Sequence, residues 1–168
     1  VGCGHVGKDL GVLLRAFGCK VLAHDILNFP DFYAENGIEP VGLEEMLRES
    51  DVITLHLPLD ETTWNILSAE RLALMKLDAI FINTARGELV DEEALKVALK
   101  DGRLLGAAFD VFATEPPEDQ ELLNLPNFIV SPHIGGSAEE AILAMGRAAI
   151  RGLDENRAPE PGVFPDGY

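Results

Sequence analysis

The first part of the chain carries apolar residues at the three- and four-residue spacing of an amphipathic helix. Between positions 5 and 17 these residues are Val6, Leu10, Leu13, Leu14 and Phe17. Gly18 then stands where a C-terminal cap is expected. A short apolar strand at residues 20–24 follows and ends at Asp25. The chain is therefore predicted to open on a helix followed by a strand.

Strands and helices alternate along the rest of the chain. Short apolar runs predict strands at residues 51–57, 79–83, 105–111 and 128–130. Helical patterns occur at residues 43–49, 68–75 and 91–100, with a short helix or loop at 30–37. A long amphipathic helix starts at the capping-box pair Ser137 and Glu140. This alternation predicts an α/β fold with a doubly wound parallel sheet, whose ligand binds at the carboxyl ends of the strands.

Composition supports one globular domain. The chain has 168 residues, of which 47% are hydrophobic and 25% charged. We assign residues 1–158 to this domain and residues 159–168, rich in Pro and Gly, to an irregular tail. Apolar runs are shorter than the roughly 18 residues of a membrane span. Cys3 and Cys19 fit neither a metal site nor a disulfide, and predict buried or half-buried thiols in a reducing compartment. The cytoplasm is the expected location.

The chain is strongly acidic. It has 13 basic and 29 acidic residues, for a net charge of -16. Such a charge repels nucleic acid and anionic membranes, so neither is expected as a partner. It is compatible with ordinary solubility and with a high-salt habitat, and both remain open.

A Gly-x-Gly-x-x-Gly motif occupies Gly2, Gly4 and Gly7. In a dinucleotide-binding loop these glycines allow a tight turn, a close approach to the pyrophosphate and helix packing on the sheet. Alone, the spacing fits an ordinary turn equally well. Asp25 lies 18 residues beyond Gly7 at a strand end, where an acidic side chain binds the adenosine ribose. No Arg or Lys follows it closely to bind a 2′-phosphate, so NAD is favoured over NADP.

Four polar stretches follow predicted strands and therefore lie at one edge of the sheet. They are HLPL at 56–59, NTARG at 83–87, DVFATEP at 110–116 and SPHIGG at 131–136. Together they bring one Arg, one Glu and one His to the edge that holds the glycine loop. This set suits anion binding and acid–base chemistry.

These motifs resemble the NAD-binding domain of the D-isomer-specific 2-hydroxyacid dehydrogenases, a family that includes D-3-phosphoglycerate, glyoxylate/hydroxypyruvate and D-lactate enzymes. The similarity extends from GCGHVG through HLPLDETT, NTARGELVDEEAL and FDVFATEPP to SPHIGG. Asp60-Glu61 replaces the usual Thr-Pro pair. The resemblance implies a Rossmann-type domain and hydride transfer between NAD(H) and a 2-hydroxy or 2-keto acid.

The resemblance implies three catalytic residues. Arg86 would bind the substrate carboxylate with its forked guanidinium. His133 would exchange a proton with the substrate oxygen, and Glu115 would favour its imidazolium form. The alternatives are a surface ion pair for Arg86, a structural role for His133 and a local cap for Glu115.

The resemblance also implies the residues that contact NAD, with Asp110 holding the nicotinamide carboxamide. His56 is expected to be structural, and Trp64 and Met75 to pack in the core or at an interface. The expected cofactor-binding residues are Gly2, Gly4, His5, Val6, Gly7, Asp25, Leu57, Pro58, Thr63, Thr84, Ala85, Arg86, Asp110, His133, Gly135 and Gly136.

Family members carry a substrate domain that is absent from this chain, and the first strand of the sheet is expected to be truncated. We therefore expect the isolated chain to bind NAD(H) weakly and to turn over no 2-keto acid, and the whole protein to be a homodimer. Two other functions remain open. One is a dehydrogenase-like NAD-sensing scaffold or corepressor. The other is an adenosylhomocysteine hydrolase-like domain, indicated by GHVGK at residues 4–8 but disfavoured by Arg86, Glu115 and His133.

Overall fold

A computed structural model describes residues 1–155 of the chain. It contains two compact units, Val1–Pro132 and a second one that begins at His133. The predicted tail at residues 159–168 lies outside the described residues.

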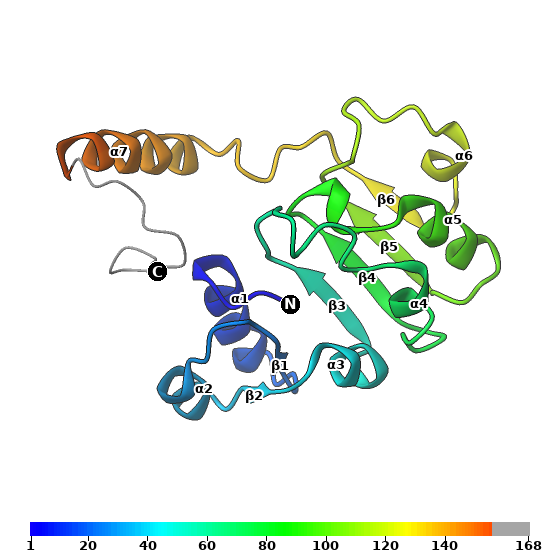
Figure 1. The fold of residues 1–168 in the computed structure, drawn as a ribbon, viewed down its shortest axis with the longest axis horizontal. Coiled ribbons are helices and arrows are strands. Elements are labelled where there is room, and N and C mark those ends of the chain that lie inside the picture. Colours follow the sequence, from blue (N-terminus) through cyan, green and yellow to red (C-terminus); the bar gives the residue numbers. More distant parts are fainter. Residues whose placement is uncertain (156–168) are drawn as a thin grey trace. The chain divides into compact units, whose positions relative to one another are not determined.

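The first unit alternates helices and strands (Figure 1). Its helices are α1 (His5–Ala16), α2 (Pro30–Asn36), α3 (Leu43–Glu49), α4 (Ala69–Leu72), the 3-10 turn η1 (Gly87–Leu89), α5 (Glu92–Lys100) and α6 (Gln120–Leu123). Its strands are β1 (Leu22–Ala23), β2 (Glu39–Pro40), β3 (Val52–Leu55), β4 (Ile80–Asn83), β5 (Gly106–Phe109) and β6 (Phe128–Val130). In the second unit, α7 (Glu139–Glu155) is the long amphipathic helix expected from the sequence.

The strands form two parallel sheets. One has the order β3-β4-β5-β6 and the other pairs β1 with β2. In the larger sheet Leu55 is level with Asn83, Asn83 with Phe109, and Phe109 with Val130. The carboxyl ends of four strands therefore meet at one edge, as predicted. The parallel α/β architecture is confirmed.

The core lies between the larger sheet and its helices. Its aromatic part is a cluster in which Phe109 contacts Phe81, Phe112 and Phe128 at ring-centroid distances of 5.3–6.0 Å. On one flank, α4 packs against α3 and α5. Phe81 and Phe109 are almost fully buried. Each buried aromatic side chain contributes about 2–3 kcal/mol to folding. This packing fixes the strand ends that carry the polar loops.

Val1 and Gly2 join the two sheets. The Val1 nitrogen donates to the Thr54 carbonyl at 2.8 Å, and the His56 amide donates to the Val1 carbonyl at 2.8 Å. On the other side, the Gly2 amide donates to the His24 carbonyl at 2.8 Å. These two residues thus occupy a strand position between β1 and β3.

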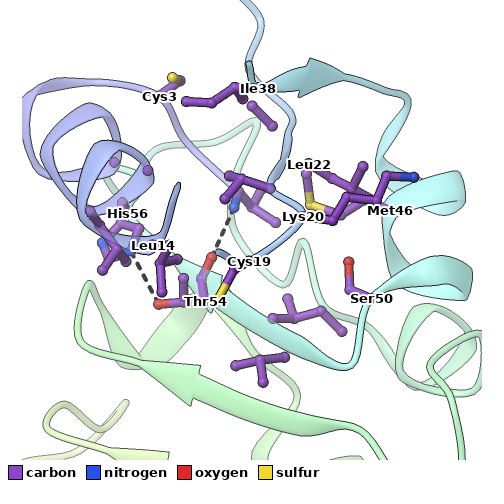
Figure 2. Close-up of a pocket in the computed structure, with 18 of the residues that line it drawn as sticks. Cys3, Leu14, Cys19, Lys20, Leu22, Ile38, Met46, Ser50, Thr54 and His56 are labelled. Carbon is purple, nitrogen blue, oxygen red and sulfur yellow. Dashed lines mark hydrogen bonds between the residues drawn. The ribbon is translucent and has the colours of Figure 1, made fainter. Parts of the chain in front are cut away.

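A cavity of about 420 Å³ lies beside Val1 and Gly2 and is lined by residues of β1 and β3. Its apolar lining comes from α1, β1, α3 and β3 and includes Leu14, Leu22, Met46 and Val52 (Figure 2). Asp25 and Gly4 are not among its lining residues. The cavity is therefore a gap in the sheet rather than the ligand site at the strand ends.

The Val1 ammonium group at the end of this cavity makes folding depend on pH. Burial lowers its pKa from 8.0 to about 6, against the opposing effect of Cys3 and Asp25. Between these values the unfolded chain binds a proton that the folded chain releases, so stability rises with pH. We expect this amine to raise the free energy of unfolding of the polypeptide by about 2 kcal/mol from pH 6 to pH 8. Urea unfolding at both pH values measures it.

Acetylation of the Val1 amine is the matched control for this prediction. It removes the titrating amine, so most of the increase between pH 6 and pH 8 should disappear. A remainder of about 1 kcal/mol or less should come from His56, because burial lowers its pKa from 6.5 to about 4 and the upper end of that window lies above pH 6. An equal increase in the acetylated chain would contradict the assignment to Val1.

Several sequence expectations require correction. Cys3 is buried as predicted, but Cys19 is exposed, because it follows the end of α1 and lines the cavity described above. Met75 packs in the core, one of the two places expected for it, whereas Trp64 is 65% exposed and does not. Three short elements, β2, η1 and α6, were not predicted. Within residues 1–155, the helices are too short or too polar to cross a membrane.

Candidate functional site

The glycine loop connects Val1 to α1, and two of its glycines are required by backbone contacts. Gly2 has φ +89°, and a Cβ there would lie 2.5 Å from the His56 carbonyl oxygen. A Cβ on Gly7 would lie 2.1 Å from the Gly2 carbonyl oxygen. Both distances exclude a side chain. The loop is therefore folded tightly onto itself and onto the end of β3.

Gly4 differs from these two glycines. A Cβ at Gly4 would meet no described atom within 4 Å. Gly4 is also the N-cap of α1, which receives no side-chain cap and has no acidic residue in its first turn. The loop thus presents open space and helix N–H groups at the same place, which is what a pyrophosphate requires.

Asp25 lies directly beside this loop. Its Oδ2 accepts from the Cys3 amide at 2.6 Å, and its Oδ1 accepts from the Leu27 amide at 2.8 Å. These two bonds fix the orientation of the carboxylate at the end of β1. The residues present therefore fit an NAD molecule, with the phosphates at the loop and the adenosine ribose at Asp25.

Arg86 follows the end of β4 in a turn held by Asn83. The fully buried Asn83 side chain accepts from the Ala85 amide at 3.1 Å and donates to the Arg86 carbonyl at 2.8 Å. The Arg86 guanidinium is exposed and donates to the Ala85 carbonyl. A rigid turn thus carries a solvent-accessible cation at the carboxyl edge of the sheet.

Glu115 belongs to the loop that follows β5. Its Oε1 accepts from the Phe112 amide at 3.0 Å, so the side chain folds back onto its own loop. The local-cap alternative is therefore present in the structure. It does not exclude a second role, because the carboxylate is exposed.

The Arg86 turn and the Glu115 loop are in direct contact. Gly87, the residue after Arg86, lies so close to this loop that a Cβ would be 1.9 Å from the Phe112 carbonyl carbon. The backbone of the Arg86 turn therefore contacts the backbone of the loop that carries Glu115.

Asp110 marks the end of β5 and is buried. Its Oδ1 accepts from the Ser131 hydroxyl at 2.5 Å, which joins the ends of β5 and β6. The backbone agrees, because the Ser131 amide donates to the Phe109 carbonyl at 2.9 Å. Asp110 is thus held in one orientation at the site edge.

His133 begins the second unit, as do the predicted cofactor residues that follow it, Gly135 and Gly136. His133 is exposed and has φ 52°, a left-handed conformation uncommon for a residue other than glycine. Its role as partner of Glu115 stays a prediction.

The remaining predicted residues border the same edge. His5 and Val6 are exposed in the first turn of α1, and Thr84 is exposed after β4. The Thr63 hydroxyl donates to the Pro58 carbonyl at 2.8 Å and so closes the loop after β3. Leu57 and Ala85 are partly buried against the core.

The His56 side chain at this edge is partly buried, whereas that of Arg86 is exposed. Its Nε2 is 3.1 Å from the Thr54 hydroxyl, as Figure 2 shows. Because burial keeps its pKa near 4, its ring is neutral at neutral pH. This agrees with the structural role expected for it.

Three residues of the site were not singled out from the sequence, namely Asn83, Ser131 and Glu92. Asn83 bonds to the Arg86 carbonyl, Ser131 bonds to Asp110, and Glu92 Oε1 accepts from the Ala113 amide at 2.8 Å. In the sequence, Asn83 ends one apolar strand and Ser131 follows another, and these positions could have indicated both residues. Within the described residues, no group of three His, Cys, Asp or Glu side chains could hold a metal ion.

Comparison with known proteins gives a consistent result. Residues 1–135 match the family model for the NAD-binding domain of D-isomer specific 2-hydroxyacid dehydrogenases. A glycerate dehydrogenase of Methylorubrum extorquens is 46% identical over 164 residues, covering 96% of this chain and 50% of that protein. A glyoxylate reductase of Korarchaeum cryptofilum is 40% identical, covering 91% of this chain and 46% of that protein.

Solved structures show the same fold. A D-lactate dehydrogenase from Lactobacillus jensenii, crystallised with NAD+, superimposes with a TM-score of 0.81 and 32% identity. The match covers 94% of this chain and 52% of that one. The chain therefore spans about half the length of the relatives it matches.

Proposed function

This chain belongs to the D-isomer specific 2-hydroxyacid dehydrogenases, as their NAD-binding domain, and we propose that the whole protein reduces a 2-keto acid to a D-2-hydroxy acid with NADH. The observation that carries the proposal is the contact of Gly87 with Phe112. It joins a cationic turn and a carboxylate loop at the edge that also holds the glycine loop. Anion binding and proton transfer can therefore occur beside the cofactor.

NAD supplies a hydride donor and acceptor at C4 of its nicotinamide. In the proposal, the glycine loop and the start of α1 bind the phosphates, and Asp25 binds the ribose hydroxyls. Asp110, oriented by Ser131, fixes the carboxamide.

Arg86 and His133 act on the substrate in this proposal. The Arg86 guanidinium binds the carboxylate of the keto acid with two parallel hydrogen bonds and places its carbonyl carbon toward the ring. The His133 imidazolium donates one proton to the carbonyl oxygen as the hydride arrives at carbon. Glu115 stabilises that imidazolium. One hydride and one proton thus convert the ketone to an alcohol.

NADH oxidation by the full-length protein tests this proposal. Glyoxylate, hydroxypyruvate and pyruvate are assayed separately, followed by absorbance at the NADH band. We expect substrate-dependent oxidation with at least one of them. NADH binding without turnover of any 2-keto acid would favour the NAD-sensing scaffold and contradict an enzyme.

The 168-residue chain alone should bind NADH but turn over no 2-keto acid. Its side of the site holds Arg86 and Glu115, whereas a second domain is required to exclude water from the substrate. Fluorescence titration with NADH and the same absorbance assay check both parts. Turnover comparable to that of the full-length protein would contradict this expectation.

We further propose that the full-length protein is a cytoplasmic homodimer. Helix α7 carries apolar side chains that are each more than half exposed, namely Ile142, Met145, Ile150 and Leu153. Trp64 is similarly exposed. Apolar surface of this kind is typical of subunit contacts. A light-scattering mass of one subunit would contradict the dimer.

A further inference from the structure

The loop that carries Glu115 is held by carboxylates at two consecutive amides. The Phe112 amide donates to Glu115 within the loop at 3.0 Å. The next amide, that of Ala113, donates to Oε1 of Glu92 at 2.8 Å. Glu92 is the first residue of α5, 21 positions away in sequence. One bond is therefore local, and the other ties the loop to a helix.

Gly87 contacts the same two residues of the loop. A Cβ at Gly87 would lie 1.9 Å from the carbonyl carbon of Phe112 and 2.1 Å from the nitrogen of Ala113. The loop thus touches the Arg86 turn through Gly87 and α5 through Glu92. Displacing the Ala113 amide would move both the Glu115 loop and its contact with the turn.

Glu92 makes this contact in an unfavourable electrostatic setting. Burial raises the pKa of Glu92, the hydrogen bond from the Ala113 amide lowers it, and nearby Asp119, Glu88 and Glu93 raise it. Lys96 is engaged elsewhere, with Asp119 at 2.7 Å and Glu93 at 2.8 Å. The dipole of α5 favours an acid in its first turn. The hydrogen bond from the Ala113 amide then fixes the direction of this carboxylate.

We propose that Glu92 is a positioning residue for the reaction, which holds the Glu115 loop against the Arg86 turn by accepting the Ala113 amide. The inference rests on the proposed function. Glu92 touches neither substrate nor cofactor and acts through Glu115. Its loss lets the loop shift, so that Glu115 and the Arg86 turn no longer keep their relative positions.

Three variants of the full-length enzyme separate the hydrogen bond from the charge. Glu92→Ala removes the acceptor, and Glu92→Asp keeps the charge on a side chain too short to reach Ala113. Both should lower kcat by about ten-fold, the effect of one lost hydrogen bond, with KM for NADH unchanged. Glu92→Gln keeps the acceptor and should retain wild-type activity. Glu93→Ala, on the same helical turn, is the matched control.

Rescue by the conservative variant gives a readout that a purely structural role would not produce. At equal folded fractions, measured by urea unfolding, Glu92→Gln should keep the wild-type kcat, whereas Glu92→Ala and Glu92→Asp should show the lower kcat. Hydrogen exchange of the Ala113 amide should accelerate in the same two variants.

Each outcome decides the matter. An active parent enzyme with unchanged kcat in Glu92→Ala and Glu92→Asp would overturn the role of Glu92 and leave the proposed function intact. A Glu92→Gln enzyme as impaired as Glu92→Ala would also overturn it, by assigning the effect to charge. A parent enzyme inactive on every 2-keto acid would overturn the proposed function itself.

Discussion

Replacing Arg86 by Gln in the full-length protein is expected to lower kcat/KM for its 2-keto acid by about 30- to 5,000-fold. This range corresponds to the roughly 2–5 kcal/mol lost when one partner of a hydrogen-bonded charge pair is removed. Arg86→Lys keeps the charge but loses the fork, so its loss should be smaller. Steady-state kinetics with saturating NADH measure both.

The stability of the Arg86 variants separates chemistry from folding. The Arg86 guanidinium is exposed and donates to the carbonyl of its neighbour Ala85, so we expect the urea midpoint to change little. Arg103→Gln is the matched control, because Arg103 is also exposed and contacts the Ala73 carbonyl. Equal activity losses in the Arg86 and Arg103 variants would contradict a substrate-binding role for Arg86.

The second large effect is expected from two single-methyl changes in the glycine loop. Gly7→Ala should destabilise the chain by about 3 kcal/mol or more, because the new Cβ would lie 2.1 Å from a backbone oxygen. Gly4→Ala should unfold at the wild-type urea concentration, since φ -74° suits alanine and no described atom is near.

NADH affinity should show a loss in Gly4→Ala, the variant whose stability is unchanged. Gly4→Ala places a methyl group in the space that the pyrophosphate requires, so its affinity for NADH should fall by at least about ten-fold in a folded protein. Fluorescence titration and urea unfolding on the same samples give both values. Wild-type NADH affinity in Gly4→Ala would place the phosphates elsewhere.

Much of the fold is predictable because strand ends are marked locally. Apolar runs such as residues 79–83 end at polar residues, and parallel pairing then aligns those ends. The level positions of Leu55, Asn83 and Phe109 follow from this rule. Two short elements that were not predicted, β2 and α6, have two and four residues and lack a resolvable period.

The supports of the site are harder to predict than its reactive groups. Arg86 and Glu115 lie in recognisable motifs, but their positioning depends on bonds between distant residues. The Glu92 bond to Ala113 spans 21 positions, and the Ser131 bond to Asp110 also spans 21. Such pairs depend on how α5, β5 and β6 pack. Exposed Cys19 is a similar case, since nothing in its local sequence distinguishes it from buried Cys3.

The central claim is D-specific hydride transfer beside this domain, and isotope transfer tests it most directly. The full-length protein is incubated with each of the three 2-keto acids and NADH carrying deuterium at both C4 positions, and the product is analysed by mass spectrometry and chiral chromatography. The account predicts one deuterium at C2 of the product from at least one 2-keto acid, with the D configuration for hydroxypyruvate or pyruvate. Unlabelled or L-configured product, or no product from any 2-keto acid, would contradict it.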